Sequence, residues 1–199
     1  MKMQNLDGFT ISPATTAVAG DLANFVVLAG DGLPLILWES LRGPGETVMD
    51  VGRRRALRDE GAFSYRNADI AVRQGEVVAA LVSYPIHPDT DPEPLQDLPE
   101  LFRPLAALEN KTIASWYINV LATYPAARRQ GIASALLTEA ERKAREAGFD
   151  RLSLIVADTN PARSLYERSG FRASDHAAMV KDGWAHPGRD WILMIKPIG

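Results

Sequence analysis

The chain contains no cysteine among its 199 residues. Disulfide bonds, thiolate metal ligands and cysteine nucleophiles are therefore excluded, and a reducing cytoplasmic location is expected. The only histidines are His87, His176 and His186, which lie far apart and lack metal-ligand spacing. We therefore expect no metal site.

The sequence also lacks a long uninterrupted hydrophobic run and an excess of basic residues. Its most apolar stretch, residues 25–38, is broken by Gly30, Asp31, Gly32 and Pro34. Its start has no apolar core of signal-peptide length, so we expect neither a leader nor a membrane span. The net charge of −3 leaves no basic surplus for a nucleic-acid backbone. We therefore expect a globular protein that binds neither membranes nor nucleic acids.

Hydrophobic periodicity predicts alternating strands and helices. Strands are predicted at residues 9–11, 68–73, 77–85, 115–123, 152–157, 171–180 and 191–196. Helices are predicted at residues 14–29 (with Ser12 as N-cap and Pro13 next), 33–41, 47–60, 132–147 and 160–169. Residues 87–104 are rich in proline and acidic side chains and are expected to form a loop. The strand–helix alternation requires a parallel strand pair. The predicted fold is therefore α/β, with a mixed sheet flanked by helices on both faces.

A candidate anion site lies where a predicted strand meets the helix at 132–147. The helix carries one apolar stripe, and Arg128, Arg129, Gln130 and Gly131 immediately precede it. A helix N-terminus offers unpaired N–H groups and a partial positive charge, and a glycine lets the backbone approach a ligand. The alternative is a solvated helix start with two surface arginines. The chain has no Gly-Lys pair and no Rossmann glycine pattern, which disfavours nucleoside triphosphates and dinucleotides.

Two stretches of the chain resemble the GNAT (GCN5-related) N-acetyltransferases. Residues 121–133, Leu-Ala-Thr-Tyr-Pro-Ala-Ala-Arg-Arg-Gln-Gly-Ile-Ala, resemble the acyl-CoA-binding motif of this family. Residues 160–171, Asn-Pro-Ala-Arg-Ser-Leu-Tyr-Glu-Arg-Ser-Gly-Phe, are similar to its second motif. The two motifs stand in the order and at the spacing seen in the family.

The resemblance implies one acetyltransferase domain over residues 1–199. Residues 9–110 would supply the N-terminal and acceptor-side elements, 115–171 the acyl-CoA motifs and 172–199 a strand pair. The sheet would have about seven strands and would splay between its fourth and fifth strands. Acetyl-CoA would be the acyl donor, with its pantetheine arm in this gap. The implied cofactor-binding residues are Leu121, Ala122, Thr123, Arg128, Arg129, Gln130, Gly131, Ile132, Ala133, Ser134, Asn160, Arg163 and Tyr166.

Acyl transfer to an amine requires a base, stabilisation of the carbonyl oxygen and an acid for the departing thiolate. The resemblance makes Tyr166 the general acid, whereas the helix pattern alone also allows a packing aromatic. Tyr117 and Asn119 share one strand face, where they would hold a water that takes the amine proton. Glu39 and Glu109 are alternative bases.

The expected function is acetyl transfer from acetyl-CoA to a primary amine by direct attack. The rivals are a non-catalytic acyl-CoA-binding or regulatory module on the same fold and an interaction domain that binds another anion. Dimers are common in the family, so a homodimer is allowed. Trp184 and Trp191 either line the acceptor site or pack, and packing is favoured for Trp191. The acceptor, the acyl-chain preference and the oligomeric state are left open.

Overall fold

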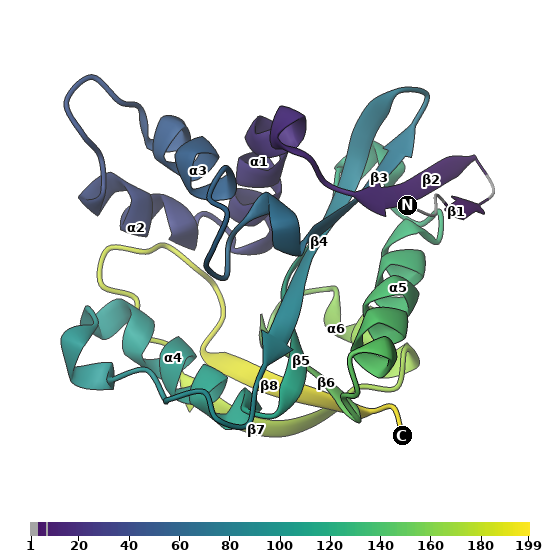
Figure 1. Cartoon of the computed structure of the whole chain (residues 1–199). Coiled ribbons are helices and arrows are strands. Elements are labelled where there is room, and N and C mark those ends of the chain that lie inside the picture. Colours follow the sequence, from purple (N-terminus) through teal and green to yellow (C-terminus); the bar gives the residue numbers. More distant parts are fainter. Residues whose placement is uncertain (1–3, 7) are drawn as a thin grey trace. The chain divides into compact units, whose positions relative to one another are not determined.

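The computed structural model describes residues 4–6 and 8–199, which form two compact units (Figure 1). The first unit runs up to Ser83 and resumes over Asn119–Thr138. The second unit combines Tyr84–Ile118 with Glu139–Gly199. The chain thus passes three times from one unit to the other, and two strands and one helix contribute residues to both.

An antiparallel set of strands forms the sheet of the first unit. Its members are β1 (Gln4–Leu6), β2 (Phe9–Pro13), β3 (Ala68–Arg73) and the part of β4 (Glu76–Ile86) up to Ser83. Each strand pairs with the next. The turn between β3 and β4 has positive φ at Gln74 (52°) and Gly75 (85°), as the type I′ hairpin turn requires.

Two features of this sheet differ from the prediction. Strand β1 was not expected. Ser12 and Pro13, expected to open a helix, instead end β2, where they pair with Ile70 and Asp69. The helix is displaced along the chain, with a 3₁₀ turn at Thr16–Val18 before it. Backbone pairing with a neighbouring strand therefore outweighs the local capping signal at Ser12.

Helices α1 (Ala19–Ala29), α2 (Leu33–Ser40) and α3 (Val48–Ala56) pack together in the first unit. α3 begins with a capping box, in which Thr47 Oγ1 accepts from the Asp50 N–H (3.2 Å) and the Asp50 carboxylate accepts from the Thr47 N–H (2.8 Å). Trp38 of α2 is buried and stacks on Phe63, with 6.1 Å between ring centroids.

The contact between Gly52 of α3 and the Trp38 ring yields a stability prediction. A Cβ at position 52 would collide with this buried ring. We expect Gly52→Ala to lower the free energy of unfolding by about 1–3 kcal/mol, as overpacking does, measured by urea denaturation. Gly20→Ala is the matched control, because Gly20 is helical and exposed and a Cβ added there would meet no atom within 4 Å outside its own helix backbone. It should stabilise the protein by about 0.5–1 kcal/mol, and equal effects of the two changes would contradict the prediction.

The second unit contains a parallel strand pair. Its strands are the Ser115–Ile118 part of β5 (Ser115–Thr123), then β6 (Arg151–Ala157), β7 (Arg172–Ala178) and β8 (Asp190–Pro197). β5 and β6 run parallel, whereas β6–β8 and β8–β7 are antiparallel. The register of β7 shifts between Ala173 and Asp175. The mixed sheet predicted from the sequence is confirmed, with one strand more than the expected seven.

The helices of the second unit are α4 (Arg103–Glu109), α6 (Arg163–Arg168) and the C-terminal part of α5 (Ile132–Glu146). Helix α4 was not predicted: residues 87–104 end in this helix after 3₁₀ turns at Leu95–Asp97 and Glu100–Phe102. Leu101, Ala106 and Leu108 of this region are buried, and the helix packs on β6, β7 and β8. Within the described ranges, no helix has both the length and the hydropathy needed to cross a bilayer.

Asn110 and Lys111 fasten the α4 region to its surroundings. The Asn110 side chain accepts from the Glu93 N–H (2.8 Å) and donates to the Glu93 carbonyl (3.0 Å), which holds the acidic segment before α4. Lys111 Nζ lies 2.5 Å from the Asp175 carboxylate of β7. The segment expected to form a loop is therefore anchored within the second unit and ends in a helix.

Candidate active site

The loop that leads into α5 has the geometry of an anion-binding turn. A 3₁₀ turn at Pro125–Ala127 precedes it, and both Arg129 (φ 60°) and Gly131 (φ 78°) adopt the left-handed conformation. Such conformations turn successive backbone N–H groups toward one concavity. Helix α5, of 15 residues, begins directly after this turn, and a helix N-terminus offers unpaired N–H groups and a partial positive charge.

Side-chain contacts fix this loop within the first unit. Arg128 Nε donates to the Thr123 carbonyl (3.1 Å). The Gln130 side chain accepts a hydrogen bond from Arg73 of β3 and donates to the Ala126 carbonyl (3.4 Å). The loop is therefore anchored to the end of β5 and to the β3–β4 hairpin, and Arg73 adds a third arginine that the sequence analysis did not single out.

The space above Gly131 is open. A Cβ built at this glycine would meet no atom within 4 Å, and Arg128, Arg129, Gln130 and Ser134 are exposed. An exposed left-handed turn with arginines and free helix N–H groups fits a pyrophosphate. The residues present therefore suit the phosphate end of acetyl-CoA.

Strand β5 ends just before this loop and pairs with β6 over part of its length. Its pairing with β6 covers Trp116–Ile118 opposite Leu152–Leu154. β5 then continues to Thr123 and β6 to Ala157. Backbone groups of β5 beyond this pairing, such as those of Leu121 and Thr123, suit an extended ligand that binds as an added strand would.

Asn160 and Arg163 lie in the second unit, where local contacts hold them. Asn160 Oδ1 accepts from the Ala162 N–H (2.9 Å), so this side chain forms a turn at the start of α6. Arg163 Nη1 donates to the Asp158 carbonyl (3.1 Å). Asn160 thus shapes the entry of α6, and its contact with the cofactor stays a prediction.

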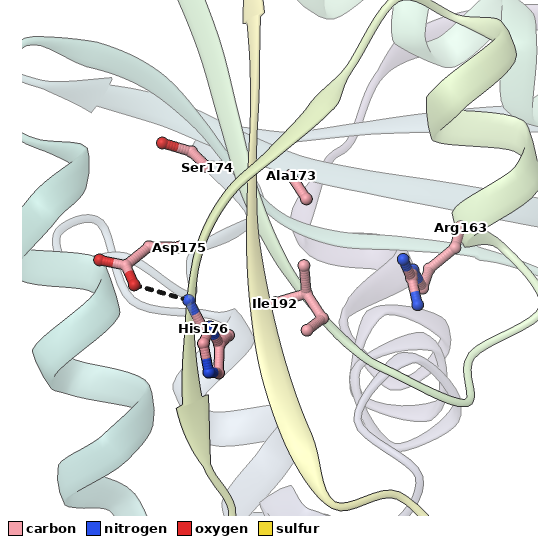
Figure 2. A pocket seen from close by; sticks show the side chains of 6 residues that line it. All are labelled: Arg163, Ala173, Ser174, Asp175, His176 and Ile192. Carbon is pink, nitrogen blue, oxygen red and sulfur yellow. Dashed lines mark hydrogen bonds between the residues drawn. The ribbon is translucent and has the colours of Figure 1, made fainter.

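Figure 2 shows the Arg163 side chain beside Ile192, in a surface depression of about 270 Å³. The other residues lining the depression are Ala173, Ser174, Asp175 and His176 of β7. The His176 N–H donates to Asp175 Oδ1 (2.7 Å), and the same carboxylate binds Lys111. In the second unit, the Arg163 side chain is therefore directed toward the β7–β8 surface.

Tyr166 of α6 is nearly buried, with 6% of its surface exposed. Its ring packs edge-on against Phe171, with 5.9 Å between centroids. Burial raises the pKa of Tyr166 to about 12. The phenol therefore keeps its proton at neutral pH and remains an O–H donor, as a general acid must before it acts.

In the second unit, the half-buried Glu109 pairs with the buried Tyr117. Tyr117 Oη donates to Glu109 Oε1 (2.9 Å), and Tyr84 of β4 packs edge-on against the Tyr117 ring at 5.8 Å. Burial raises the pKa of Glu109, the Tyr117 hydrogen bond partly lowers it, and the charge of Glu93 raises it further. Burial also raises the pKa of Tyr117 well above its usual value. Periodicity placed Tyr117 on its strand face, but its contact with Glu109 arises only in the folded chain.

The remaining candidates differ in their surroundings. Asn119 is exposed and belongs to the first unit, whereas Tyr117 belongs to the second. Glu39 is also in the first unit, where it is exposed and paired with Arg42 (2.8 Å). Trp184 and Trp191 stack on each other at 5.7 Å and are both buried, which agrees with a packing role.

Structural comparison gives relatives that span nearly the whole chain. The arylalkylamine N-acetyltransferase 2 of Aedes aegypti has a TM-score of 0.66 at 15% identity, covering 96% of this chain and 99% of its own. The Drosophila melanogaster polyamine N-acetyltransferase has a TM-score of 0.65 at 15% identity, covering 95% and 99%. An Elizabethkingia anophelis GNAT family acetyltransferase with acetyl-CoA bound has a TM-score of 0.58 at 20% identity, covering 96% and 99%. At these identities the comparison establishes the fold.

Sequence comparison supplies the family. No curated protein gives a significant sequence match. The model of the acetyltransferase (GNAT) family matches residues 36–171, which is more than half of the chain and includes both motifs. With the mixed sheet, the anion-binding turn and the buried Tyr166 in place, the chain belongs to the GNAT acetyltransferase family.

Proposed function

We propose that this protein transfers an acetyl group from acetyl-CoA to a primary amine by direct attack of the amine on the thioester, within one acetyltransferase domain in the cytoplasm. The exposed left-handed turn at Arg129 and Gly131, which begins the long helix α5 within the matched family region, is the observation that carries the proposal. The relatives from Aedes aegypti and Drosophila melanogaster are named for arylalkylamine and polyamine acceptors. These names support an amine as the acceptor class.

Few groups take part in the proposed reaction. Backbone N–H groups at the end of β5 polarise the thioester carbonyl. A water at Tyr117 and Asn119 receives the amine proton. Tyr166 protonates the sulfur as the C–S bond breaks, because burial keeps its phenol protonated. No covalent enzyme intermediate is required, and the cysteine-free sequence offers no thiol for one.

Binding of the acyl donor can be tested without knowing the acceptor. At 100 times its dissociation constant, acetyl-CoA should raise the free energy of unfolding by about 2.7 kcal/mol. For a chain of this length that corresponds to a rise of about 5–10 °C in Tm, measured by differential scanning fluorimetry. AMP is the matched control, since it lacks the pyrophosphate and the pantetheine arm, and it should produce a much smaller shift.

The outcomes separate the three functions considered. No shift with acetyl-CoA would refute the proposal. A shift with acetyl-CoA, but no acetyl transfer to any member of a primary-amine panel, would favour the non-catalytic acyl-CoA-binding module. An equal shift with inorganic pyrophosphate at saturation, without competition by CoA, would favour a binding domain for another anion.

A further inference from the structure

A half-buried carboxylate next to β5 has no neighbouring cation among the residues that the structure describes. Glu109 ends α4, and its carboxylate makes no ion pair within residues 4–6 and 8–199. Lys111, two residues further on, binds Asp175 instead. The groups that act on Glu109 are Tyr117 from β5 and Glu93 from the acidic segment, neither of which is positively charged.

The contact between Glu109 and Tyr117 does not by itself explain a carboxylate at this position. A neutral amide would accept the same Tyr117 hydrogen bond without the cost of burying a charge. A carboxylate differs from an amide in that it can take up a proton. A partly desolvated carboxylate that lacks a counter-ion is therefore a candidate for proton transfer.

The backbone around Glu109 is held in place. Thr112 Oγ1 donates to the Glu109 carbonyl (2.7 Å). Ser115 Oγ, at the start of β5, donates to the Thr112 carbonyl (2.5 Å) and contacts Ser153 Oγ of β6 (2.5 Å). These bonds connect the end of α4 to the parallel strand pair, so Glu109 has a defined position relative to Tyr117.

Tyr117 stands close to the point where the parallel pairing ends. It pairs with Ser153, one residue before the last pair of β5 and β6 at Ile118 and Leu154. Under the proposed function, the thioester lies where these strands separate. Tyr117 Oη lies 2.9 Å from Glu109 Oε1. The thioester, the phenol and the carboxylate would then stand in the order that a proton relay requires.

We infer that Glu109 is the final acceptor of the amine proton, which reaches it through Tyr117; this inference rests on the proposed function. The neutral amine uses its lone pair to form the N–C bond and acquires a positive charge. Its N–H bond then breaks, and the proton passes through the water to Tyr117 Oη while the Tyr117 proton moves to Glu109 Oε1. The C–S bond breaks, and the sulfur takes the Tyr166 proton. Exchange with solvent restores Glu109 and Tyr166.

The relay predicts a characteristic pH dependence. A base acts in its deprotonated form, so kcat/KM should rise with pH through the pKa of Glu109, which lies above the ordinary value of 4.5. Tyr84 and Glu93 are the titratable groups that act on the Glu109–Tyr117 pair. Burial raises the pKa of Tyr117 well above its usual value and disfavours the phenolate, so in the proposed relay Tyr117 gives its proton to Glu109 as it receives another.

The contribution of Glu109 to the free energy of unfolding falls as pH rises, whereas kcat/KM increases. The pKa of Glu109 is higher in the folded than in the unfolded chain. Its contribution to stability is therefore complete below the unfolded pKa and is lost as pH rises through the folded pKa. Above this folded pKa the wild-type chain bears the cost of desolvating the charge, and Glu109→Gln removes that cost.

The test compares Glu109→Gln, Tyr117→Phe and the matched control Glu93→Gln by pH profiles of kcat/KM and by Tm at pH 7.5. The assay uses acetyl-CoA and the best acceptor from a primary-amine panel that includes agmatine and phenylethylamine. Glu109→Gln should lower kcat/KM at least 100-fold and leave Tm equal or higher. It should also remove the acidic limb of the profile, which is the fall of kcat/KM toward low pH. Tyr117→Phe should also lower kcat/KM strongly. Glu93→Gln should keep the maximal rate and move the limb to lower pH.

The outcomes that contradict the relay are distinct from those that contradict the proposed function. If the wild type transfers acetyl groups and Glu109→Gln remains within threefold of it, the relay is wrong and the proposed function stands. A fall in kcat/KM matched by a fall in Tm, with the acidic limb retained, would also overturn the relay and assign Glu109 a structural role. If the wild type acetylates no amine, both fail.

Discussion

Tyr166→Phe should lower kcat by about 100-fold or more, the contribution typical of a general acid, and leave the dissociation constant of acetyl-CoA unchanged. Phenylalanine keeps the buried ring and its edge-on contact with Phe171 but removes the O–H group. The thiolate then leaves without a positioned proton donor. Steady-state kinetics and isothermal titration calorimetry measure the two quantities.

Tyr65→Phe provides the matched control for this change. Tyr65 is partly exposed, and its hydroxyl donates to Asp59 (2.9 Å) in the first unit. This variant should retain the wild-type kcat. Because the pKa of Tyr166 is about 12, the wild-type kcat should show no alkaline decline from this group below pH 10. An unchanged kcat in Tyr166→Phe would instead identify Tyr166 as a packing residue.

Gly131→Ala should raise the dissociation constant of acetyl-CoA by about tenfold to 100-fold, the equivalent of one or two charge-assisted hydrogen bonds. The added methyl group enters the open space above the anion-binding turn, where the pyrophosphate is proposed to approach the backbone. The left-handed φ of 78° adds strain of about 1–2 kcal/mol for any residue with a Cβ. Calorimetric titration with acetyl-CoA measures the affinity.

Gly148→Ala separates the effect on binding from the effect on the backbone. Gly148 follows the other end of α5 and has a φ of 82°, and a Cβ added there would also meet no atom within 4 Å. Its substitution should cause similar strain and a similar loss of Tm, with unchanged affinity for acetyl-CoA. If the two alanine variants lose affinity equally, the Gly131 turn is not the phosphate site.

Elements defined by local periodicity could be predicted from the sequence. All seven predicted strands are present, because a short run of strand-forming residues bounded by turn residues is a local property of the sequence. Strands β3 and β4 contain continuous buried runs and do not alternate. The apolar stripe likewise located α5, although the observed helix ends at Glu146. Helix α4 was missed because prolines and acidic residues dominate its neighbourhood, and its apolar residues contact strands distant in sequence.

The candidate site was predictable only in part, for a similar reason. The turn at Gly131 depends on residues that are neighbours in the sequence. A glycine directly before α5 was therefore enough to anticipate its left-handed backbone. The pairing of Glu109 with Tyr117 depends on the burial of both groups and on the course of the chain between α4 and β5. The same holds for Arg73, which reaches Gln130 from a strand far earlier in the chain.

Strand β7 limits how copies of this chain can associate. It ends the strand order, and an unprotected edge of this kind is a template for edge-to-edge pairing and aggregation. Here the register shift between Ala173 and Asp175 interrupts the pairing of β7 with β8, and Lys111 forms an ion pair with the Asp175 carboxylate. Arg172 adds a further charge on the exposed edge. A continuous intermolecular sheet through β7 is therefore disfavoured.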